Sequence, residues 1–342
     1  MKLLYIGNDF AKGGYNSSMN TLSNSFEKES IDIIRTSSKS NRIIRMLDML
    51  INIWKYRSNV SYTIIDTFST FSFFYALICS QFLRLLQKKY ILILRGGNLP
   101  QRLENNKIMT KLLFKNSYLN VAPSNYLLEA FKEYGYNSVF IPNILEIDLY
   151  KFKERKIFKP KLLWVRAFDN IYNPTLAIKV LNNLKTIYKD AKLCMVGPVK
   201  DDSFNEVKDL VSRLNLQESV VFTGVLPKEE WHKLSQNYDI FINTTNIDNT
   251  PVSVMEAMAL GLPIISTNVG GLPYLIEHKT NGVLVKKNNA EVMSNAVVEI
   301  INNINQSTEM VQNARLKAES FSWANVRLKW IGLLSEHRDL MS

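Results

Sequence analysis

Histidine and cysteine are scarce in this chain of 342 residues, and their scarcity excludes several kinds of chemistry. The three histidines are His232, His278 and His337, so the first half has none. The sequence contains no HExxH motif, no Cys/His constellation and no G-x-S-x-G elbow. Zinc catalysis and triad hydrolysis are therefore not expected. The two cysteines, Cys79 and Cys194, lie among apolar residues, and we expect buried thiols in a reducing cytoplasm rather than a disulfide or a metal cluster.

Long apolar runs are also few. The N-terminal run Lys2–Ile6 is too short for the core of a signal peptide, and a glycine follows it. Phe68–Leu86 is apolar with Arg84 as its only charge, but it includes serine, threonine and glutamine and follows the strand pattern Tyr62–Asp66. We expect a strand that leads into a buried helix. A membrane-spanning helix is the alternative, although a span usually needs about 20 more uniformly apolar residues.

Acidic residues are outnumbered. The chain has 42 Lys and Arg against 31 Asp and Glu, a net charge of +11. Residues 1–150 hold 18 basic and 11 acidic residues, so most of the excess lies in the first half. A basic surface favours anionic partners such as phosphates, lipid headgroups or nucleic acid. Nucleic acid is not expected, because the excess is modest and no zinc finger, basic zipper or RNP-like motif is present.

Strand and helix patterns alternate twice along the chain, which indicates an α/β fold with parallel sheets. A polar, charged stretch at 146–161 is interpreted as the connection between a domain of residues 1–150 and a second of residues 151–320. Two such units in tandem imply a cleft between them, and ligands of these sheets lie outside the carboxyl ends of the strands. The clearest strand patterns are, in order, Lys2–Ile6, Ser61–Asp66, Tyr90–Leu94, Asn120–Ala122, Val139–Ile141, Leu162–Arg166, Lys192–Val196, Val220–Phe222, Asp239–Asn243 and Pro263–Ser266.

The segment Asp248–Pro263 is the most informative. Thr250 suits the N-cap of a helix and Pro251 its first position. Gly261 suits the residue just beyond the last turn. The sequence therefore predicts both ends of this helix.

The position of this helix predicts a binding site. It follows a strand that ends in the polar run Asn243–Asn246, so its N-terminus is expected at the carboxyl edge of the sheet. The free N–H groups near Val252 and Ser253 and the helix dipole favour an anion such as a diphosphate. The Glu256 carboxylate could accept hydrogen bonds from two ribose hydroxyls, and Asp248 could hold hydroxyls beyond the phosphates. The alternative is that Asp248 is a loop residue and Glu256 a solvated helix charge.

This segment resembles the E-x7-E signature of the retaining family 4 glycosyltransferases, which have the GT-B fold. The first acid here is Asp248, eight positions before Glu256, and the stretch 261–285 is similar to the family's next block. Other similar motifs are spread over the chain: Arg166 after the strand Leu162–Val165, Val196–Pro198, Phe222–Gly224, Ala122–Ser124, Ile141–Asn143, and Gly13 and Gly14 as the glycine-rich turn near the donor phosphates.

The resemblance implies two facing Rossmann-like domains with an interdomain cleft, with a C-terminal stretch of about 321–342 packed on the first. The second domain would bind the nucleotide sugar, with Glu256 on the ribose and Asp248 on the transferred sugar. Backbone near Gly197 and Val225 would contact the base, and Arg166 with the first amides of the helix would face the diphosphate. No metal and no cofactor are implied. The full set of donor-binding residues is Gly13, Gly14, Arg95, Gly97, Arg166, Gly197, Val225, Asn249, Thr250, Pro251, Val252, Ser253 and Glu256, with Asp248, Arg166 and Glu256 as the catalytic ones.

The sequence departs from the family pattern in three ways. The family pairs its arginine with a lysine about five residues on, but after Arg166 the next lysine is Lys179. Arg95, beside the glycine pair Gly96–Gly97, is the candidate for the missing charge, and a surface arginine at a strand end is the alternative. The family's first-domain histidine is absent. The first acid is Asp248 rather than glutamate, which shortens its reach by one methylene.

The first half also contains a basic, amphipathic pattern. Arg42–Tyr56 predicts a helix, and three lysines, Lys107, Lys111 and Lys115, recur every four residues. The helix either packs by its apolar side under a solvated charged face, or contacts anionic lipid at a membrane surface. Its apolar stripe consists of Ile43, Leu47, Leu50 and Trp54, and its polar face of Arg42, Arg45, Asp48, Asn52 and Lys55.

These features together predict a retaining, metal-independent glycosyltransferase. It would move a hexose or N-acetylhexosamine from a nucleotide sugar, UDP or GDP most readily, to a glycan or lipid-linked acceptor. Bacterial surface polysaccharide or glycolipid synthesis is the expected setting, in the cytoplasm or at the inner face of the cell membrane. Two alternatives stay open: a non-catalytic nucleotide-sugar-binding subunit that scaffolds a membrane assembly, and a nucleotide-sugar epimerase or hydrolase of the same fold.

Overall fold

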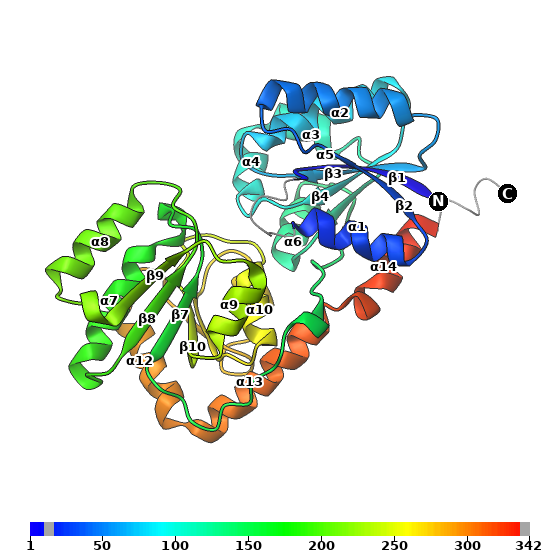
Figure 1. Ribbon diagram of the computed structural model, residues 1–342. Coiled ribbons are helices and arrows are strands. Elements are labelled where there is room, and N and C mark those ends of the chain that lie inside the picture. Colours follow the sequence, from blue (N-terminus) through cyan, green and yellow to red (C-terminus); the bar gives the residue numbers. More distant parts are fainter. Residues whose placement is uncertain (10–16, 336–342) are drawn as a thin grey trace. The chain divides into compact units, whose positions relative to one another are not determined.

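The computed structural model describes residues 1–9 and 17–335, and it divides the chain into two compact domains (Figure 1). The first comprises residues 1–144 together with the C-terminal part from Trp323, and the second comprises Leu145–Ser322. Gly13 and Gly14, predicted at the donor phosphates, lie outside the described residues.

The first domain is built on a six-stranded parallel sheet of order β2-β1-β3-β4-β5-β6. Its central strands are runs of Ile, Leu, Val and Tyr, as is typical of parallel strands that are covered on both faces. The strands are β1 (Lys2–Ile6), β2 (Asp32–Thr36), β3 (Tyr62–Thr67), β4 (Tyr90–Leu94), β5 (Leu119–Ala122) and β6 (Ser138–Phe140). The helices are α1 (Ser18–Lys28), α2 (Arg42–Tyr56), α3 (Ser72–Leu85), α4 (Leu99–Asn105), α5 (Lys107–Phe114), α6 (Asn125–Glu133) and α14 (Trp323–Ser335).

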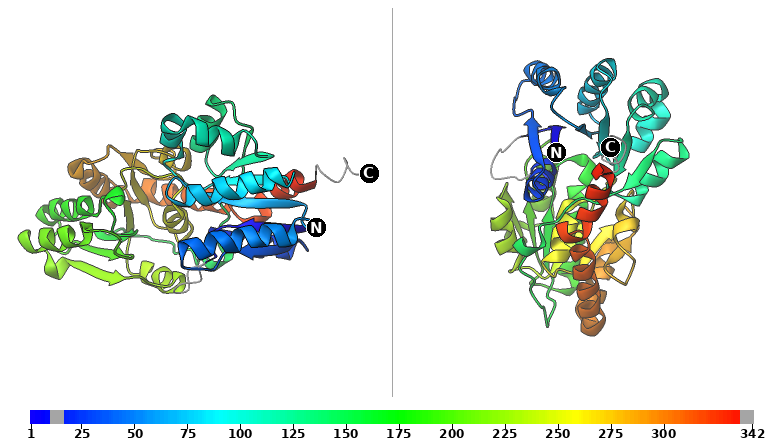
Figure 2. Two further views of the ribbon diagram at one scale, coloured as in Figure 1. Left: turned by 90° about the horizontal axis from the view of Figure 1, so that it is seen from above. Right: turned by 90° about the vertical axis from the view of Figure 1, so that its right-hand side faces the viewer.

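Alternate residues of the first sheet enter two different cores. Leu4 and Ile6 pack with α2 to α6, whereas Leu3 and Tyr5 pack with α1 and α14. On the right of Figure 2, α2 and α3 accordingly lie on one side of the sheet, and α1 (blue) and α14 (red) on the other. Trp330 of α14 makes an edge-to-face contact with Phe26 of α1, with ring centroids 5.4 Å apart. The C-terminal helix therefore belongs to the first domain.

The second domain also has a six-stranded parallel sheet, with a different strand order, β12-β11-β10-β7-β8-β9. One face packs on α7, α8, α12 and part of α13, and the other on α9, α10, α11 and the end of α13. The strands are β7 (Lys161–Val165), β8 (Lys192–Val196), β9 (Val220–Gly224), β10 (Ile240–Asn243), β11 (Ile264–Thr267) and β12 (Val283–Val285). The helices are α7 (Pro174–Ile187), α8 (Ser203–Arg213), α9 (Lys228–Ser235), α10 (Val252–Ala259), α11 (Leu272–Leu275), α12 (Ala290–Asn302) and α13 (Ile304–Glu319), with short 3-10 turns η1 (Ile147–Leu149), η2 (Asn170–Tyr172) and η3 (Gln217–Ser219).

The stretch 146–161 is not the free connection that its polarity suggested. Tyr150 and Phe158 are buried in the cores of the second domain. Arg155 is buried too, and its guanidinium donates to backbone carbonyls that include those of Ser235 and Tyr238. The second domain therefore begins at Leu145 rather than at 151. The stretch packs into this domain despite its polarity, because the buried guanidinium of Arg155 satisfies neighbouring backbone carbonyl groups.

The apolar segment 68–86 contains the helix α3, and the preferred interpretation of a strand that leads into a helix is confirmed, although only one face of the helix is buried. Strand β3 leads into α3, whose Phe73, Ala76, Cys79 and Leu83 are buried in the core. Within the described parts of the chain, no helix has both the length and the apolar character to cross a bilayer.

Candidate functional site

The predicted site residues of the second domain meet at the point where its strand order reverses. Strand β7 lies between β8 and β10, and the chain leaves it first toward β8 and later returns on the other side. Arg166 follows β7 directly, and Asp248 lies in the loop after β10. In open α/β sheets the crevice at such a reversal, outside the carboxyl ends of the strands, is the usual ligand site.

Arg166 and Asp248 form an ion pair at this edge. The guanidinium of Arg166 donates to a carboxylate oxygen of Asp248, and the two side chains are mostly buried. The ring centroid of Tyr172 lies 4.7 Å from the guanidinium carbon of Arg166, so the two side chains make a cation–π contact. Burial raises the pKa of Asp248, and Arg166 opposes that rise. A carboxylate and a cation thus lie together near the start of the helix that follows Asp248.

That helix, α10, begins one residue later than predicted. Pro251 is its N-cap and Val252 its first residue, so Thr250 lies outside the helix and does not cap it. Proline occupies the cap because it has no N–H to leave unsatisfied. The C-terminal end agrees with the prediction: Gly261 has a φ of 76° just beyond the cap residue Leu260.

Unpartnered polar groups gather at the N-terminus of α10. Among the residues that the structure describes, Arg166 Nε, Thr250 Oγ1 and Ser253 Oγ are buried without a hydrogen-bond partner. Helix geometry leaves the amides of Val252 and Ser253 without a partner inside the helix. Buried polar groups are nearly always satisfied in native proteins, so a concentration of donors without partners points to an absent ligand rich in acceptors.

Glycines allow the loops to approach this site closely. A side chain on Gly271 would lie 2.0 Å from the carbonyl oxygen of Asn249, and one on Gly270 would lie 2.1 Å from that of Asp248. Gly197, at the end of β8, has a φ of 151°, and a side chain there would lie 1.8 Å from the carbonyl oxygen of Arg166. These contacts fix the backbone that carries Asp248 and Arg166. Val225, predicted at the base, follows Gly224 after β9 and is exposed.

Glu256 is not a solvated helix charge. It is 4% exposed, and its Oε1 accepts a hydrogen bond from Tyr150 Oη at 3.0 Å and an ion pair from Lys228 Nζ at 2.9 Å. Burial raises the pKa of Tyr150, and Glu256 adds to that rise, so the phenol stays a donor. The ring centroid of His232 lies 4.6 Å from that of Tyr150, with the ring planes tilted by 48°, and burial, with Lys228 contributing, lowers the pKa of His232 to about 4.

Sequence reasoning did not identify Lys228 and Tyr150. Lys228 opens α9 and Tyr150 follows the turn η1, so both reach Glu256 from elements distant in the sequence. No local spacing links them to Glu256. One signal could have pointed to Lys228. A buried acid such as Glu256 needs a cation nearby, and the lysine expected shortly after Arg166 is absent, so a cation from another part of the chain was to be sought.

Arg95 lies in the first domain, in a buried polar network. Its Nε donates to Asp66 Oδ1 at 2.9 Å, and its two terminal nitrogens donate to Tyr5 Oη at 3.0 Å and to the side chain of Asn143. Although burial disfavours its charge, Asp66 and Tyr5 keep the pKa of Arg95 above its ordinary value. Each nitrogen of the guanidinium is committed to an internal partner. Gly97 lies in the turn after β4, close to this network in the sequence.

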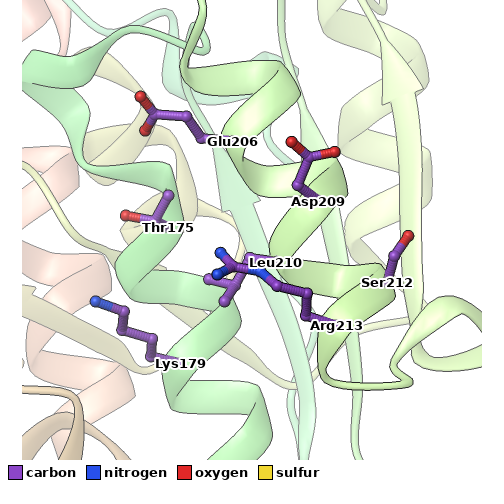
Figure 3. A pocket seen from close by; sticks show the side chains of 7 residues that line it. All are labelled: Thr175, Lys179, Glu206, Asp209, Leu210, Ser212 and Arg213. Atoms are coloured by element: carbon purple, nitrogen blue, oxygen red, sulfur yellow. The ribbon is translucent and has the colours of Figure 1, made fainter.

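A concave region lies between α7 and α8, apart from the predicted site residues. It is a surface groove of about 800 Å³, lined by seven residues of these helices (Figure 3). Two of its lining side chains are basic, Lys179 and Arg213, and two are acidic, Glu206 and Asp209. Its charges balance, and none of the predicted site residues lines it. Within residues 1–9 and 17–335, no three His, Cys, Asp or Glu side chains form a metal-binding group.

The comparison with protein families agrees with this site. The profile of the family described as glycosyl transferases, group 1, matches residues 147–317, which is half of the chain and includes the whole Arg166, Asp248 and Glu256 region. The chain belongs to this family. The prediction of a glycosyltransferase from the E-x7-E resemblance is therefore confirmed at the level of group 1.

Relatives of known sequence are similar over part of their length. An uncharacterized glycosyltransferase of Haemophilus influenzae is 30% identical over 207 residues, which cover 60% of this chain and 57% of the relative. The amylovoran biosynthesis glycosyltransferase AmsK of Erwinia amylovora is 29% identical over 121 residues, which cover 34% of this chain and 30% of AmsK. The matched region is thus about half or less of each relative.

Solved structures match over nearly the whole chain. Sucrose-phosphate synthase from Thermosynechococcus elongatus has a TM-score of 0.82 at 14% identity and covers all of both chains. HepE from Anabaena, in complex with UDP, has a TM-score of 0.77 at 16% identity and covers 98% of this chain and 100% of HepE. At such low identity the likeness shows the fold, and it confirms the predicted GT-B class.

Proposed function

We propose that this protein is a retaining glycosyltransferase that takes its sugar from a nucleoside diphosphate sugar bound to the second domain. The observation that carries the proposal is the cluster of unpartnered donors at the N-terminus of α10, beside Arg166 and within the same helix as the buried Glu256. A helix N-terminus with an arginine beside it suits a diphosphate, and a buried carboxylate further along the helix suits the ribose hydroxyls.

The residues have distinct roles in the proposed reaction. Arg166 and the amides of Val252 and Ser253 neutralise the diphosphate as its bond to the anomeric carbon breaks. The acceptor hydroxyl forms its bond to that carbon on the same face, and its proton passes to the leaving phosphate oxygen. Asp248 orients the hydroxyls of the transferred sugar. Because protein donors meet the charge of the leaving group, we propose that the transfer needs no divalent metal and no cofactor.

Lys228 supplies the cation that the sequence pattern lacked. Its Nζ is 2.9 Å from Glu256 Oε1, so it fixes the carboxylate in the orientation that faces the ribose. We propose that this lysine, rather than Arg95, compensates for the missing partner of Arg166.

The donor and acceptor classes follow from the site and from the relatives. UDP and GDP are the favoured donors, and HepE, a protein of the same fold, has been solved in complex with UDP and with UDP-glucose. The name of AmsK refers to amylovoran biosynthesis, and that of another relative, WcaL, to colanic acid biosynthesis. We propose a hexose or N-acetylhexosamine donor, a glycan or lipid-linked acceptor of bacterial surface polysaccharide or glycolipid synthesis held on the first-domain side, and a cytoplasmic reaction.

A donor survey tests this function. UDP-, GDP-, ADP- and dTDP-sugars are added singly in the presence of EDTA, and the thermal shift and the release of free sugar are measured. Stabilisation by one donor with slow hydrolysis supports the transferase and identifies the donor for acceptor trials. If no donor shifts the melting temperature, the assignment around Glu256 is wrong.

The variant Asp248→Ala separates the transferase from its alternatives. The transferase predicts that this variant still binds donor but transfers nothing. A scaffold subunit would bind donor and show no turnover in the wild type either. An epimerase would interconvert the sugar of the donor without any acceptor.

A further inference from the structure

The amphipathic helix α2 turns an apolar stripe toward solvent. Ile43, Leu47, Ile51 and Trp54 recur every three or four residues and are 73%, 53%, 62% and 53% exposed. The buried face of the same helix is formed by Met49 and Ile53 together with the side chain of Arg45. Of the predicted stripe, Ile43, Leu47 and Trp54 therefore lie outside, whereas Leu50 packs partly against the core. The helix has a second apolar face for the core.

Neighbouring helices extend this apolar surface. The ring of Trp54 stacks on that of Phe82 in α3, with centroids 6.5 Å apart. Gln81 of α3 donates to the carbonyl oxygen of Leu112 in α5, so the three helices lie side by side (Figure 1). We call the exposed apolar residues of α2, α3 and α5 the outer surface of the first domain: Ile43, Ile44, Leu47, Ile51, Trp54, Ile78, Leu85, Ile108, Met109 and Leu112. A contiguous apolar surface of this kind is uncommon on a monomer and marks an interaction site.

The stretch of chain that carries the outer surface is strongly basic. Residues 42–115, which include α2, α3 and α5, contain twelve Lys and Arg against three Asp and Glu. One of the three acids, Asp66, is buried in its ion pair with Arg95. Most of the chain's net charge of +11 is therefore concentrated in this stretch. The basic residues that lie in α2, α3 and α5 or follow these helices closely in the sequence are Arg42, Lys55, Arg57, Arg84, Lys88, Lys89, Lys107, Lys111 and Lys115.

We propose that the outer surface docks on a bilayer that contains anionic phospholipid. Helices that lie at such an interface combine an apolar face with Lys and Arg at its borders, and aromatic residues occupy the headgroup region. Arginines and aromatic residues at and near the outer surface fit this arrangement. The guanidinium of Arg57 lies 3.7 Å from the ring centroid of Trp54. The guanidinium of Arg42 lies 4.9 Å from the ring centroid of Phe71, the residue before α3. A second copy of the chain fits less well, because two such basic surfaces repel each other.

Docking would bring a lipid-linked acceptor to the first domain. This role of the docking rests on the proposed function, whereas the contact with lipid does not. The lipid contact and the donor site use different residues. Donor hydrolysis measured without vesicles therefore tests the proposed function alone, and vesicle binding measured without donor tests the docking alone.

Flotation with vesicles tests the apolar part of the surface. The wild type is expected to float with vesicles of phosphatidylglycerol and phosphatidylcholine and not with phosphatidylcholine alone. The triple variant Ile43→Gln, Leu47→Gln, Ile51→Gln is expected to lose about tenfold or more of the partition constant. The matched control carries Ile187→Gln, Val292→Gln and Leu316→Gln, three exposed apolar residues of the second domain, and is expected to float like the wild type.

The basic border is tested separately. Each basic residue near an anionic surface contributes about fivefold to the partition constant. Lys107→Gln, Lys111→Gln and Lys115→Gln together should weaken binding strongly at low salt and little at high salt. The control with Lys233→Gln, Lys286→Gln and Lys287→Gln changes the same number of charges in the second domain and should leave binding unchanged.

Tryptophan fluorescence shows which residue meets the lipid. Trp54 is exposed, whereas Trp164, Trp231 and Trp330 are buried. Vesicles should shift the emission of the wild type to the blue, and Trp54→Phe should abolish the shift. The proposal is overturned if the wild type binds neutral and anionic vesicles alike or not at all, or if the triple glutamine variant binds like the wild type. It is also overturned if light scattering finds a dimer that this variant dissociates, since the surface would then be an interface between copies.

Discussion

Both domains have a six-stranded parallel sheet, although the strand orders differ, and they place their unsatisfied groups in different locations. At the strand reversal of the second domain, Arg166 Nε, Thr250 Oγ1 and Ser253 Oγ are buried without partners among the residues described. Beside the reversal of the first domain, all three nitrogens of Arg95 donate to internal partners. The buried polar atoms that lack a partner in the described part of the first domain, such as Ser23 Oγ and Thr67 Oγ1, include no cationic group, and the exposed apolar residues of this domain lie mainly on α2, α3 and α5.

This difference indicates how the work is divided. Donors without partners need an anionic ligand, whereas exposed apolar residues need an apolar surface to cover them. In the second domain the exposed apolar residues are dispersed, with few on any one element, and need no such explanation. Two similar sheets can thus be distinguished by asking which of their groups still lack a partner.

Removing the cation of the second-domain site should have the largest effect. Arg166→Gln is expected to lower kcat for sugar transfer by about 10²–10³-fold, because it removes a donor to the charge that develops on the diphosphate. The change is measured by steady-state kinetics with saturating donor. Arg213→Gln on α8 is the matched control and should keep full activity. Equal activity of the Arg166→Gln variant and the wild type would contradict the comparison.

The corresponding change in the first domain should affect stability instead. Arg95→Gln leaves the buried carboxylate of Asp66 unpaired, which should lower the free energy of unfolding by about 3 kcal/mol. Denaturant unfolding measures this, with Arg84→Gln on α3 as a control of little effect. Donor affinity of the folded variant should be unchanged. A variant of normal stability that has lost donor turnover would instead return Arg95 to the donor site.

Lys228 tests whether the second-domain site extends beyond the residues predicted from the sequence. Lys228→Met keeps the length of the side chain but removes the ion pair with Glu256. The KM for the donor is expected to rise about tenfold, or about 1.4 kcal/mol. Lys233→Met, in the same helix, is the control. A lower KM in the Lys228 variant would mean that the lysine competes with the ribose for Glu256.

The smallest expected effect is on the pH dependence of folding stability. The pKa of His232 is lowered to about 4 by burial, with Lys228 contributing. The unfolded chain takes up this proton near pH 6.5, so the neutral folded histidine contributes its full stability above that pH and loses it as the pH falls toward 4. We expect a loss of about 1 kcal/mol over this window. Thermal unfolding of His232→Phe, compared with the wild type, should lack this component, and identical pH profiles would contradict it.

Local patterns predicted most of the fold. Buried central strands such as β4 and β8 are continuous apolar runs, and their predicted bounds agree with the structure. The edge strand β2 was missed because it is half-exposed and begins and ends with polar residues. The stretch 146–161 was misassigned because Arg155 is buried against carbonyls that only the folded chain brings together.

The site was predicted where its residues are close in sequence. Asp248, Thr250, Ser253 and Glu256 belong to one loop and helix, so spacing alone places them together. Lys228 comes from a distant helix, and nothing in its surroundings marks it. Helix α2 shows the opposite difficulty, because its pattern was recognised but periodicity cannot tell which of two apolar faces meets the core.

The central claim is that α10 and its neighbours bind a nucleoside diphosphate. Isothermal titration of UDP and GDP, in EDTA, into the wild type and Glu256→Ala tests it most directly. The account predicts binding of one nucleotide to the wild type and an affinity at least about tenfold lower in the variant, a difference of about 1.4 kcal/mol. No binding to the wild type, or equal binding to both proteins, would contradict it.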